Sequence, residues 1–396
     1  MILGFILIIL TLFGAPLFTV IAASAMLGYH REGIDLMAMA IEVIGIANMP
    51  MLSAIPLFTF AGYLLSKSQA PQRLVRLTTA LLGWMPGGLA LVALAACAFF
   101  TAFTGASGVT IIALGAILYP ALRHDGYPDK FNLGLVTTSG SLGLLFAPSL
   151  PLILYAVVAE ISIEDLFKAG VLPGALMLVL LGSYSLWVNR DNRQPLKEFS
   201  WKQVASAIWE AKWEIPLPVF VLGGIYSGLF AVSEAAAVTA LYALVVEVFI
   251  LREIRLRQLP DVMRESMLLI GGILIILGVS LASTNYMIDA GIPQKLLEYI
   301  TNFVSDQASF LFLLFIFLLI LGAILDIFSA VVLVVPLILP IAAQYGVNQF
   351  HLGIVFLAAM QLGYLTPPVG LNLFIASYRF ERPIMNVYAA TFPFLL

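Results

Sequence analysis

Long runs of apolar residues alternate with short polar stretches along almost the whole chain. A run of about 20 apolar residues is long enough to cross a hydrocarbon core of about 30 Å. Amphipathic stretches at 66–80, 200–213 and 292–304 are typical of helices that lie in the membrane interface. The pattern predicts an all-α polytopic membrane protein with spanning helices at residues 4–28, 51–66, 131–158, 166–188, 215–229, 232–251, 267–284 and 352–378.

Two of the apolar runs are interrupted at their centres by glycine and proline: LGLLFAPSLPLILY at 142–155 and LGYLTPPVGLNLFI at 362–375. Proline lacks the backbone N–H that a regular helix needs, so both runs are predicted to be broken helices. Inside lipid, the freed backbone groups must be satisfied by an ion, a substrate or protein lining a polar cavity. This pattern indicates a transporter.

The two broken helices are predicted to be repeats of inverted topology. Basic residues mark 190–212 and 252–264 as cytoplasmic, whereas 226–234 contains neither Lys nor Arg and is expected on the far side. Extending this alternation along the chain makes the two broken helices cross in opposite directions. Three residue pairs recur at one constant spacing between the copies: Phe131 with Phe350, Gly134 with Gly353, and Pro148 with Pro367.

Segments 89–119 and 309–339 precede the broken helices, and the charge alternation requires each to begin and end on one side of the membrane. We interpret both as re-entrant hairpins with polar midpoints at Thr104–Ser107 (TGAS) and Ile324–Asp326 (ILD). Polar groups at mid-membrane are costly and usually functional. For Asp326 the alternative is a carboxylate that reaches water at a loop.

A broken helix exposes carbonyls at the end of one half and amides at the start of the next, which suits a cation at one edge and an anion at the other. Sodium prefers oxygen ligands, whereas a proton relay would need several buried Asp, Glu or His. Asn372 follows Thr366 by roughly a turn and a half of helix and is placed to reach a substrate oxygen. Alternatively, the small residues only permit close helix packing. The candidate oxygens are those of Thr104, Ser107, Thr138, Ser139, Gly140 and Ser149 in the first copy and of Asp326, Ser329, Gly363 and Thr366 in the second.

Composition supports the membrane setting and excludes several functions. The 396 residues are 62% hydrophobic and only 10% charged, where soluble domains carry about 25%. A net charge of -3 shows no basic excess, so a nucleic-acid partner is not expected. The sequence has neither a P-loop nor an HExxH motif, and its three histidines are scattered, so we expect no enzyme. Without an ATPase, uphill transport would have to use an ion gradient.

Four strings together resemble a known family: FFTAFTGASGVT at 99–110, GYPDKFNLGLVTTSGSLGLLFAPSLPLILY at 126–155, GAILDIFSAVVLVVPLILP at 322–340 and LGYLTPPVGLNLFIAS at 362–377. They are similar to the large membrane subunit (DctM type) of TRAP transporters, the tripartite ATP-independent periplasmic carriers of bacteria and archaea. The resemblance covers nearly the whole chain, and TPPVGLNLF is its most specific part.

The resemblance implies an elevator-type sodium symporter, a multi-pass protein of the bacterial or archaeal cytoplasmic (inner) membrane. Its implied partners are a small four-helix membrane subunit (DctQ type) and a periplasmic substrate-binding protein (DctP type) that delivers a small organic acid. C4-dicarboxylates, sialic acid and sugar acids all remain open as substrates. The implied sodium sites are Ser107 with Gly140 and Gly143, and Asp326 with Gly363 and Thr366, while Thr104, Ser149 and Asn372 are the expected substrate contacts.

The resemblance also divides the chain. Residues 1–88 would form scaffold helices and an arm, 89–158 and 309–378 the two halves of a transport domain, 159–308 further scaffold helices and interfacial arms, and 379–396 the start of a last helix that is expected to be curtailed. Ala147 and Ile327 depart from the family pattern beside the expected ion sites. Two other functions stay open, namely a stand-alone sodium/anion carrier without a binding protein and a passive channel. An intramembrane enzyme lacks a recognisable nucleophile and base.

Overall fold

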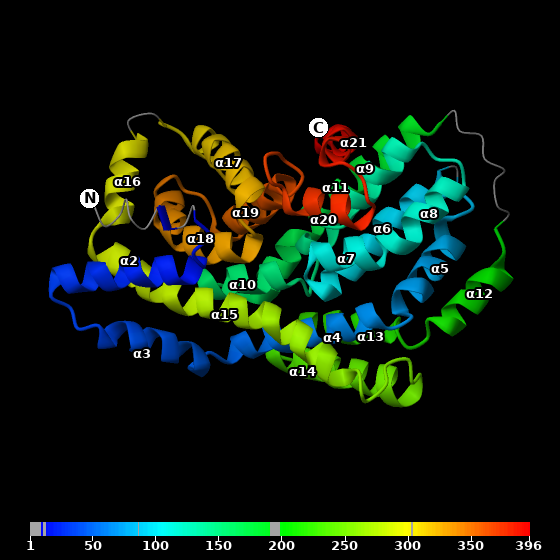
Figure 1. Ribbon diagram of the computed structural model, residues 1–396, viewed down its shortest axis with the longest axis horizontal. Coiled ribbons are helices and arrows are strands. Elements are labelled where there is room, and N and C mark those ends of the chain that lie inside the picture. Colours follow the sequence, from blue (N-terminus) through cyan, green and yellow to red (C-terminus); the bar gives the residue numbers. More distant parts are fainter. Residues whose placement is uncertain (1–8, 11–12, 86, 191–198, 302–303) are drawn as a thin grey trace.

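The computed structural model describes residues 9–10, 13–85, 87–190, 199–301 and 304–396. Throughout these residues the regular structure is helical (Figure 1). The helices are α2 (Leu17–Glu32), α3 (Met37–Gly45), η1 (Ile46–Asn48), η2 (Pro50–Ser53), α4 (Ala54–Lys67), α5 (Ala70–Leu82), α6 (Gly88–Thr104), α7 (Ser107–Ala113), α8 (Gly115–His124), α9 (Asp129–Ser139), η3 (Leu142–Leu145), α10 (Leu150–Val158), α11 (Ile163–Val188), α12 (Trp201–Glu210), α13 (Pro216–Tyr226), α14 (Val232–Leu244), η4 (Val245–Ile250), α15 (Leu259–Asp289), α16 (Ile292–Thr301), α17 (Gln307–Ile324), α18 (Ile327–Gln344), α19 (Gln349–Gly363), α20 (Leu371–Arg379) and α21 (Ile384–Leu395).

Most predicted spans correspond to observed helices. Five helices in the described part of the chain are long and apolar enough to cross a membrane, and three further pairs are bent by more than 40° at a short break. The expected uninterrupted helix at 4–28 is wrong in its described part. There the backbone turns at Gly14, where φ is +86°, and α2 starts only after Pro16. Proline at that position has no N–H to continue a helix, so the span begins later. Residues 1–8 and 11–12 lie outside the described part.

Both predicted breaks are present. In the first, α9 ends at Ser139, the short 3₁₀ helix η3 follows, and α10 begins at Leu150. In the second, α19 ends at Gly363 and α20 begins at Leu371. Each break contains one cis X-Pro bond, Ala147–Pro148 and Pro367–Pro368 respectively. The backbone groups at both breaks therefore need partners outside a regular helix.

The hairpins exchange partners between the two halves of the chain. Helix α6 packs on α9 and η3 of its own half, whereas α7 packs along α20 of the other half. The second hairpin does the same, with α17 on α19 and α18 on α10. In Figure 1 the hairpins enter from opposite ends, α6 to α8 from the right and α17 to α18 from the left, and approach each other near the centre. The first hairpin runs to His124 and the second to Gln344, so both are longer than predicted.

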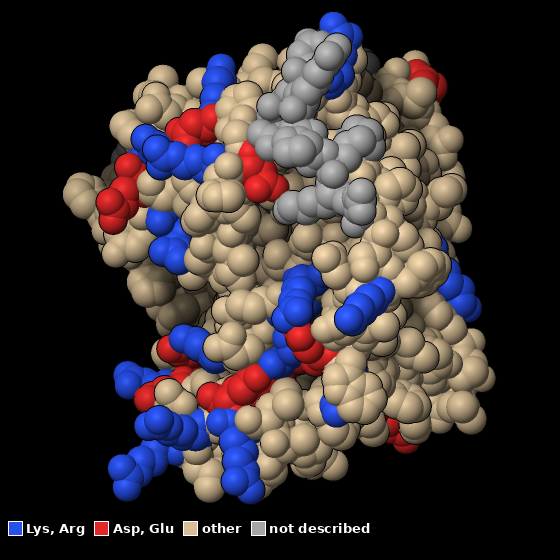
Figure 2. All heavy atoms as spheres, turned by 90° about the vertical axis from the view of Figure 1, so that its right-hand side faces the viewer, with Lys and Arg blue, Asp and Glu red and all other residues tan. Residues whose placement is uncertain are grey.

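Figure 2 looks onto the end of the molecule that lies on the right in Figure 1 and shows many Lys and Arg side chains there, with Asp and Glu among them. Here Arg73 of the amphipathic helix α5 joins three carboxylates. It pairs with Glu214 and Glu253, and one of its nitrogens lies 3.8 Å from Glu247, whose side chain is fully buried. Burial raises the pKa of the Glu214 carboxyl, although Arg73 acts in the opposite direction. This cluster fixes α5 to the turn between α12 and α13 and to η4 with the loop that follows it.

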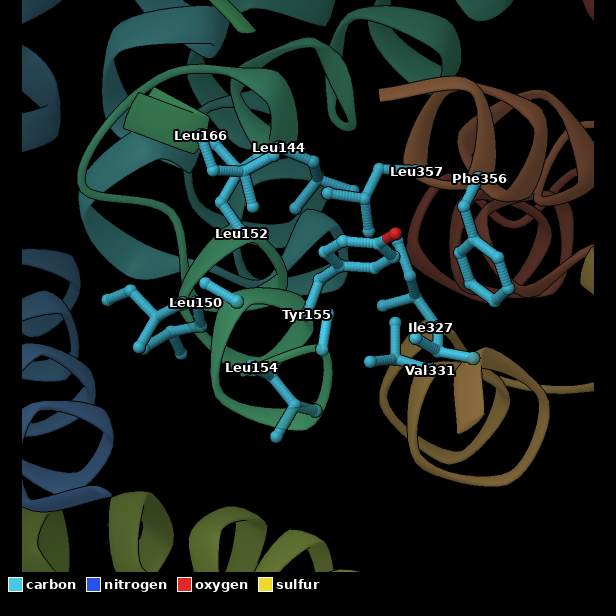
Figure 3. Close-up of a cluster of buried hydrophobic side chains, with 14 of the residues drawn as sticks. Leu144, Leu150, Leu152, Leu154, Tyr155, Leu166, Ile327, Val331, Phe356 and Leu357 are labelled. Carbon is cyan, nitrogen blue, oxygen red and sulfur yellow. The ribbon is translucent and has the colours of Figure 1, made fainter. Parts of the chain in front are cut away.

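The apolar core forms where the two halves meet. Tyr155 of α10 is fully buried, and its hydroxyl donates to the backbone oxygen of Gln349 at 3.0 Å. Figure 3 shows its ring surrounded by leucines of η3 and α10 and by Ile327 and Leu357 from the second half. Gly353 lies against the Tyr155 ring so closely that an added Cβ would come within 2.5 Å of it. Burying this large aromatic side chain stabilises the contact between the halves.

Candidate functional site

The tip of the first hairpin reaches both broken helices. Helix α6 ends at Thr104, and Gly105 turns the chain with φ at +65°. A Cβ at Gly105 would lie 2.3 Å from the side chain of Leu150, so the tip is pressed against the start of α10. A glycine is needed here both for the left-handed turn and for the close approach.

Ser107, directly after this turn, contacts the other half of the chain. Its hydroxyl donates a hydrogen bond of 2.7 Å to Oδ1 of Asn372 on α20. Both side chains are buried, and Nδ2 of Asn372 has no hydrogen-bond partner among the described residues. A buried amide donor without a partner is costly unless a ligand or an ordered water supplies an acceptor. The structure thus joins one residue predicted for sodium to one predicted for substrate.

Gly140 lies beside this pair at the end of α9. Its carbonyl accepts a 2.9 Å hydrogen bond from Thr101 Oγ1, which also lies 2.7 Å from Thr110 Oγ1. A Cβ added to Gly140 would be 3.4 Å from the carbonyl oxygen of Ser107. The two predicted sodium ligands Ser107 and Gly140 are therefore neighbours. Since a carbonyl has two lone pairs, that of Gly140 can accept one more interaction.

Two further first-copy residues, Gly143 and Ser149, have structural partners. A Cβ on Gly143 would lie 2.2 Å from the carbonyl oxygen of Ala98, so this glycine lets η3 touch α6. Ser149 is fully buried and donates to the carbonyl of Leu144 at 2.5 Å, which closes the turn between η3 and α10. Their predicted roles in binding sodium and substrate stay predictions.

Asp326 lies at the tip of the second hairpin as the N-cap of α18. Oδ1 accepts from the backbone N–H groups of Phe328 and Ser329 at 3.0 Å each, and Oδ2 accepts from the Ser329 hydroxyl at 2.5 Å. An ionised carboxylate has about four acceptor positions, so about one stays free for a cation. The side chain is half-buried, which fits neither a fully aqueous loop nor a sealed core.

The second break lies against this hairpin. Gly363 packs against Gly322 of α17, and a Cβ on Gly363 would lie 2.6 Å from the Gly322 Cα. Past the break, the Gly370 N–H donates to the carbonyl of Ala323 at 2.9 Å. The Thr366 hydroxyl donates to the carbonyl of Leu362 at 3.0 Å, so its oxygen lone pairs remain available as acceptors. Gly363 therefore contacts the second hairpin directly, and Asp326 follows at the tip of that hairpin, whereas Thr366 is hydrogen-bonded within the break itself.

Unpartnered buried atoms test whether these sites suit sodium. Oγ1 of Thr104, Oγ1 of Thr138 and Oε1 of Gln361 are buried without a hydrogen-bond partner in the part of the chain that the structure describes. All three are neutral oxygens, the donor type that a hard monovalent cation takes. Thr104 and Thr138 are at the hairpin tip and the end of α9, and Gln361 is in the last turn of α19. The donor chemistry of both breaks thus fits sodium.

Sequence reasoning missed three residues of this region. Thr101 and Thr110 hold the hairpin to Gly140, and Gln361 adds a buried oxygen before the second break. The available signal was spacing, because Thr101 precedes Thr104 by three residues and Thr110 follows Ser107 by three. Residues three apart lie on one face of a helix, so this spacing alone would have placed the two hydroxyls on the same side as the tip.

Comparison with known proteins identifies close relatives. Residues 4–396 match the family described as "Tripartite ATP-independent periplasmic transporter, DctM component". The chain is 36% identical over 362 residues to the C4-dicarboxylate TRAP transporter large permease protein DctM of Rhodobacter capsulatus, covering 87% of this chain and 82% of that one. It is 32% identical over 393 residues to the ectoine/5-hydroxyectoine TRAP transporter large permease protein UehC of Ruegeria pomeroyi, covering 98% and 92%.

A third relative is longer than this chain. The isethionate TRAP transporter permease protein DctMQ of Oleidesulfovibrio alaskensis is 33% identical over 365 residues, and the match covers 92% of this chain but 56% of that protein. Among solved structures, the YdaH transporter of Alcanivorax borkumensis superposes with a TM-score of 0.63 at 11% identity, covering 90% of this chain and 84% of that one. This last likeness concerns the fold.

Proposed function

Because this chain belongs to the DctM family of tripartite ATP-independent periplasmic transporters, we propose that it is the translocating subunit of a sodium-driven importer of small organic acids. It would work in the cytoplasmic (inner) membrane with a small four-helix subunit of the DctQ type and a periplasmic binding protein of the DctP type. The relatives are named for C4-dicarboxylate, ectoine and isethionate, which supports a small polar substrate.

The hydrogen bond between Ser107 and Asn372 is the observation that carries the proposal. Because the Ser107 hydroxyl donates its hydrogen bond to Asn372, its oxygen lone pairs remain available to a cation near the Gly140 carbonyl. A cation there would polarise the hydroxyl and hold the Asn372 amide in one orientation. The unpartnered Nδ2 is then presented to a substrate carboxylate. In this arrangement sodium binding favours substrate binding.

A second sodium would bind at the tip of the other hairpin. The free acceptor position of Asp326 would join the lone pairs of Thr366 and a carbonyl of the break near Gly363. Ser149 and Thr104, close to the first hairpin tip, are the further substrate contacts that we propose. Sodium at both breaks would order the hairpin tips and so complete the substrate site between them.

Movement would follow an elevator scheme built on inverted repeats. The exchanged packing, α7 with α20 and α18 with α10, is what two copies related by a two-fold axis in the membrane plane would make. We propose that residues 89–158 and 309–378 move together as a transport domain. The scaffold would comprise 1–88 and 159–308, with the residues from 379 starting a further helix. The loaded domain would slide across this scaffold.

A matched pair of aspartates tests the sodium site. Asp306 caps α17 with the same pattern that Asp326 uses on α18, accepting from the backbone and hydroxyl of Ser309, but it lies at an exposed helix end. Each Asp→Ala change removes a cap worth about 1 kcal/mol. Sodium-gradient uptake should be abolished in Asp326→Ala and retained in Asp306→Ala. Equal uptake by the two variants would remove Asp326 from the ion site.

The same proteoliposomes distinguish the other functions. Uptake would be measured with and without a sodium gradient, the small subunit and candidate binding proteins. Uptake by this chain alone would indicate a stand-alone carrier, and substrate flux that persists without sodium would indicate a passive channel. Our proposal requires sodium, the binding protein and the small subunit together.

A further inference from the structure

In the loop that follows α14 and η4, the acidic and the basic side chains point in different directions. The span ends in the π-helical turn η4, and Arg252 follows with a left-handed φ of +56°. The N–H groups of Glu253 and Ile254 both return to the carbonyl of Glu247, at 3.0 and 3.3 Å. These bonds fix the loop against the end of the helix, so the directions of its side chains are defined by the fold.

The one carboxylate of this loop points inward. Glu253 pairs with Arg73 and also accepts from the backbone N–H of Gln69 at 2.7 Å. Ile254 is 3% exposed and anchors the loop in a small apolar cluster with Leu64 and Val262. The Glu253 carboxylate is thus already paired within the protein.

The three arginines of the loop point outward. Arg252, Arg255 and Arg257 are exposed, and none has an ion-pair partner anywhere in the described residues. They surround a shallow concavity of about 530 Å³ together with the apolar side chains of Phe249 and Leu256. Those two side chains are 56% and 62% exposed, respectively. Three unpaired guanidinium groups therefore lie beside exposed apolar surface.

We propose that this concavity binds the headgroup of an anionic phospholipid. The candidate span Val232–Ile250 ends two residues before Arg252, which puts the arginines at the level where headgroups lie. Guanidinium groups bind phosphate oxygens in a planar, two-pronged geometry, and each basic residue at a membrane surface adds attraction for anionic lipid. Phe249 and Leu256 suit the glycerol and acyl part of a lipid, which a free phosphate lacks.

The location gives the bound lipid a consequence. Glu253 links this loop directly to Arg73 of α5. A lipid on the exposed side of the loop and helix α5 on its other side would therefore hold the same short segment. A lipid bound here would fix the end of α14 in the membrane plane. The site is separate from both broken helices and is independent of which substrate is carried.

The test compares two charge-matched double variants of the full chain, purified in detergent. Arg252→Gln/Arg255→Gln removes two arginines of the concavity, while Arg123→Gln/Lys130→Gln removes two exposed basic residues that do not line it. Binding of phosphatidylglycerol and of phosphatidylcholine would be measured by native mass spectrometry and by thermal shift, with inorganic phosphate as a further probe. We expect phosphatidylglycerol to bind preferentially and its affinity to fall about thirty-fold in the first variant only.

Three outcomes would overturn the proposal. Equal losses in both variants would mean that only the overall charge attracts the lipid. Equal protection by inorganic phosphate would identify a free-anion site. Unchanged phosphatidylglycerol binding in Arg252→Gln/Arg255→Gln, with the variant folded normally, would exclude the concavity as the binding site.

Discussion

The two polar side-chain atoms of Asn372 differ, since Oδ1 accepts from Ser107 whereas Nδ2 has no partner among the described residues, so changing one of them tests its proposed contact with the substrate. Asn372→Asp keeps an oxygen that can accept from Ser107 but replaces the unpartnered Nδ2 by a second, negative oxygen. A charge-assisted hydrogen bond is worth about 1.5–3 kcal/mol, so loss of this donor should weaken binding of an acid about ten- to a hundred-fold. Substrate titration at saturating sodium measures this, with Asn386→Asp on the exposed surface of α21 as the control.

Sodium affinity distinguishes this explanation from simple misfolding. In Asn372→Asp, sodium should still bind because Ser107 keeps its acceptor, whereas Ser107→Ala should weaken both sodium and substrate. If Asn372→Asp lost sodium and substrate binding to the same degree, the amide would not have the orienting role that we assign to it.

Candidate site residues could be proposed from the sequence, but their contacts could not. Ser107 was proposed from the polar midpoint of the first hairpin, and Asn372 from its place roughly a turn and a half after Thr366, which are local signals. The bond between them joins positions 265 residues apart, and no local pattern encodes such a contact. Asp326 shows the same limit, since its capping of α18 became visible only once the start of that helix was known.

At the scale of elements, close approach between η3 and α6 depends on Gly143. We expect Gly143→Ala to lower stability by about 1–3 kcal/mol, because its Cβ would lie 2.2 Å from a backbone oxygen that cannot move aside easily. Gly272→Ala in α15 is the matched control, since nothing lies within 4 Å of the added Cβ. Thermal unfolding in detergent, followed by intrinsic fluorescence, compares the two. An unchanged unfolding temperature in Gly143→Ala would show that η3 can shift without cost.

The breaks and hairpins were predictable as elements because proline and glycine act locally. Pro148 and Pro367 remove backbone donors wherever the chain goes, so both interruptions follow from the residues alone. The same reasoning applied to Pro16 would have shortened the first span. The exchange of α7 and α18 between the halves depends on packing across the whole chain, which periodicity does not record.

The ion pairs that attach the amphipathic helix α5 to the rest of the protein give a second prediction at this scale. Arg73→Ala would leave Glu214 and Glu247 buried without their cation, which we expect to cost about 3–5 kcal/mol. Arg76→Ala, one turn further along α5, removes only an exposed pair with Glu210 and should cost at most about 1 kcal/mol. Unfolding temperatures measured side by side test this. Similar temperatures for both variants would mean that water reaches the three carboxylates.

At the scale of the whole molecule, an elevator requires α6 to slide along α4. These two helices pack directly, and a Cβ on Gly62 of α4 would lie 2.7 Å from the Cα of Thr104, so the interface is close. Leu65 of α4 and Phe103 of α6 line the same narrow apolar cavity. A covalent link between them would prevent sliding if the halves move as we propose, whereas a channel that opens without domain movement would tolerate it.

Cross-linking in a Cys97→Ala background, where no native thiol remains, tests this movement. Leu65→Cys/Phe103→Cys treated with a short reversible bis-thiosulfonate should lose sodium-driven uptake and regain it after reduction. Tyr29→Cys/Tyr286→Cys is the control pair, because those rings are 5.8 Å apart on α2 and α15 and both helices belong to the proposed scaffold. We expect this second link to leave uptake intact. Full transport with the first pair linked would mean that α6 and α4 do not move relative to each other, and translocation would then have to occur by movement of the hairpin tips alone.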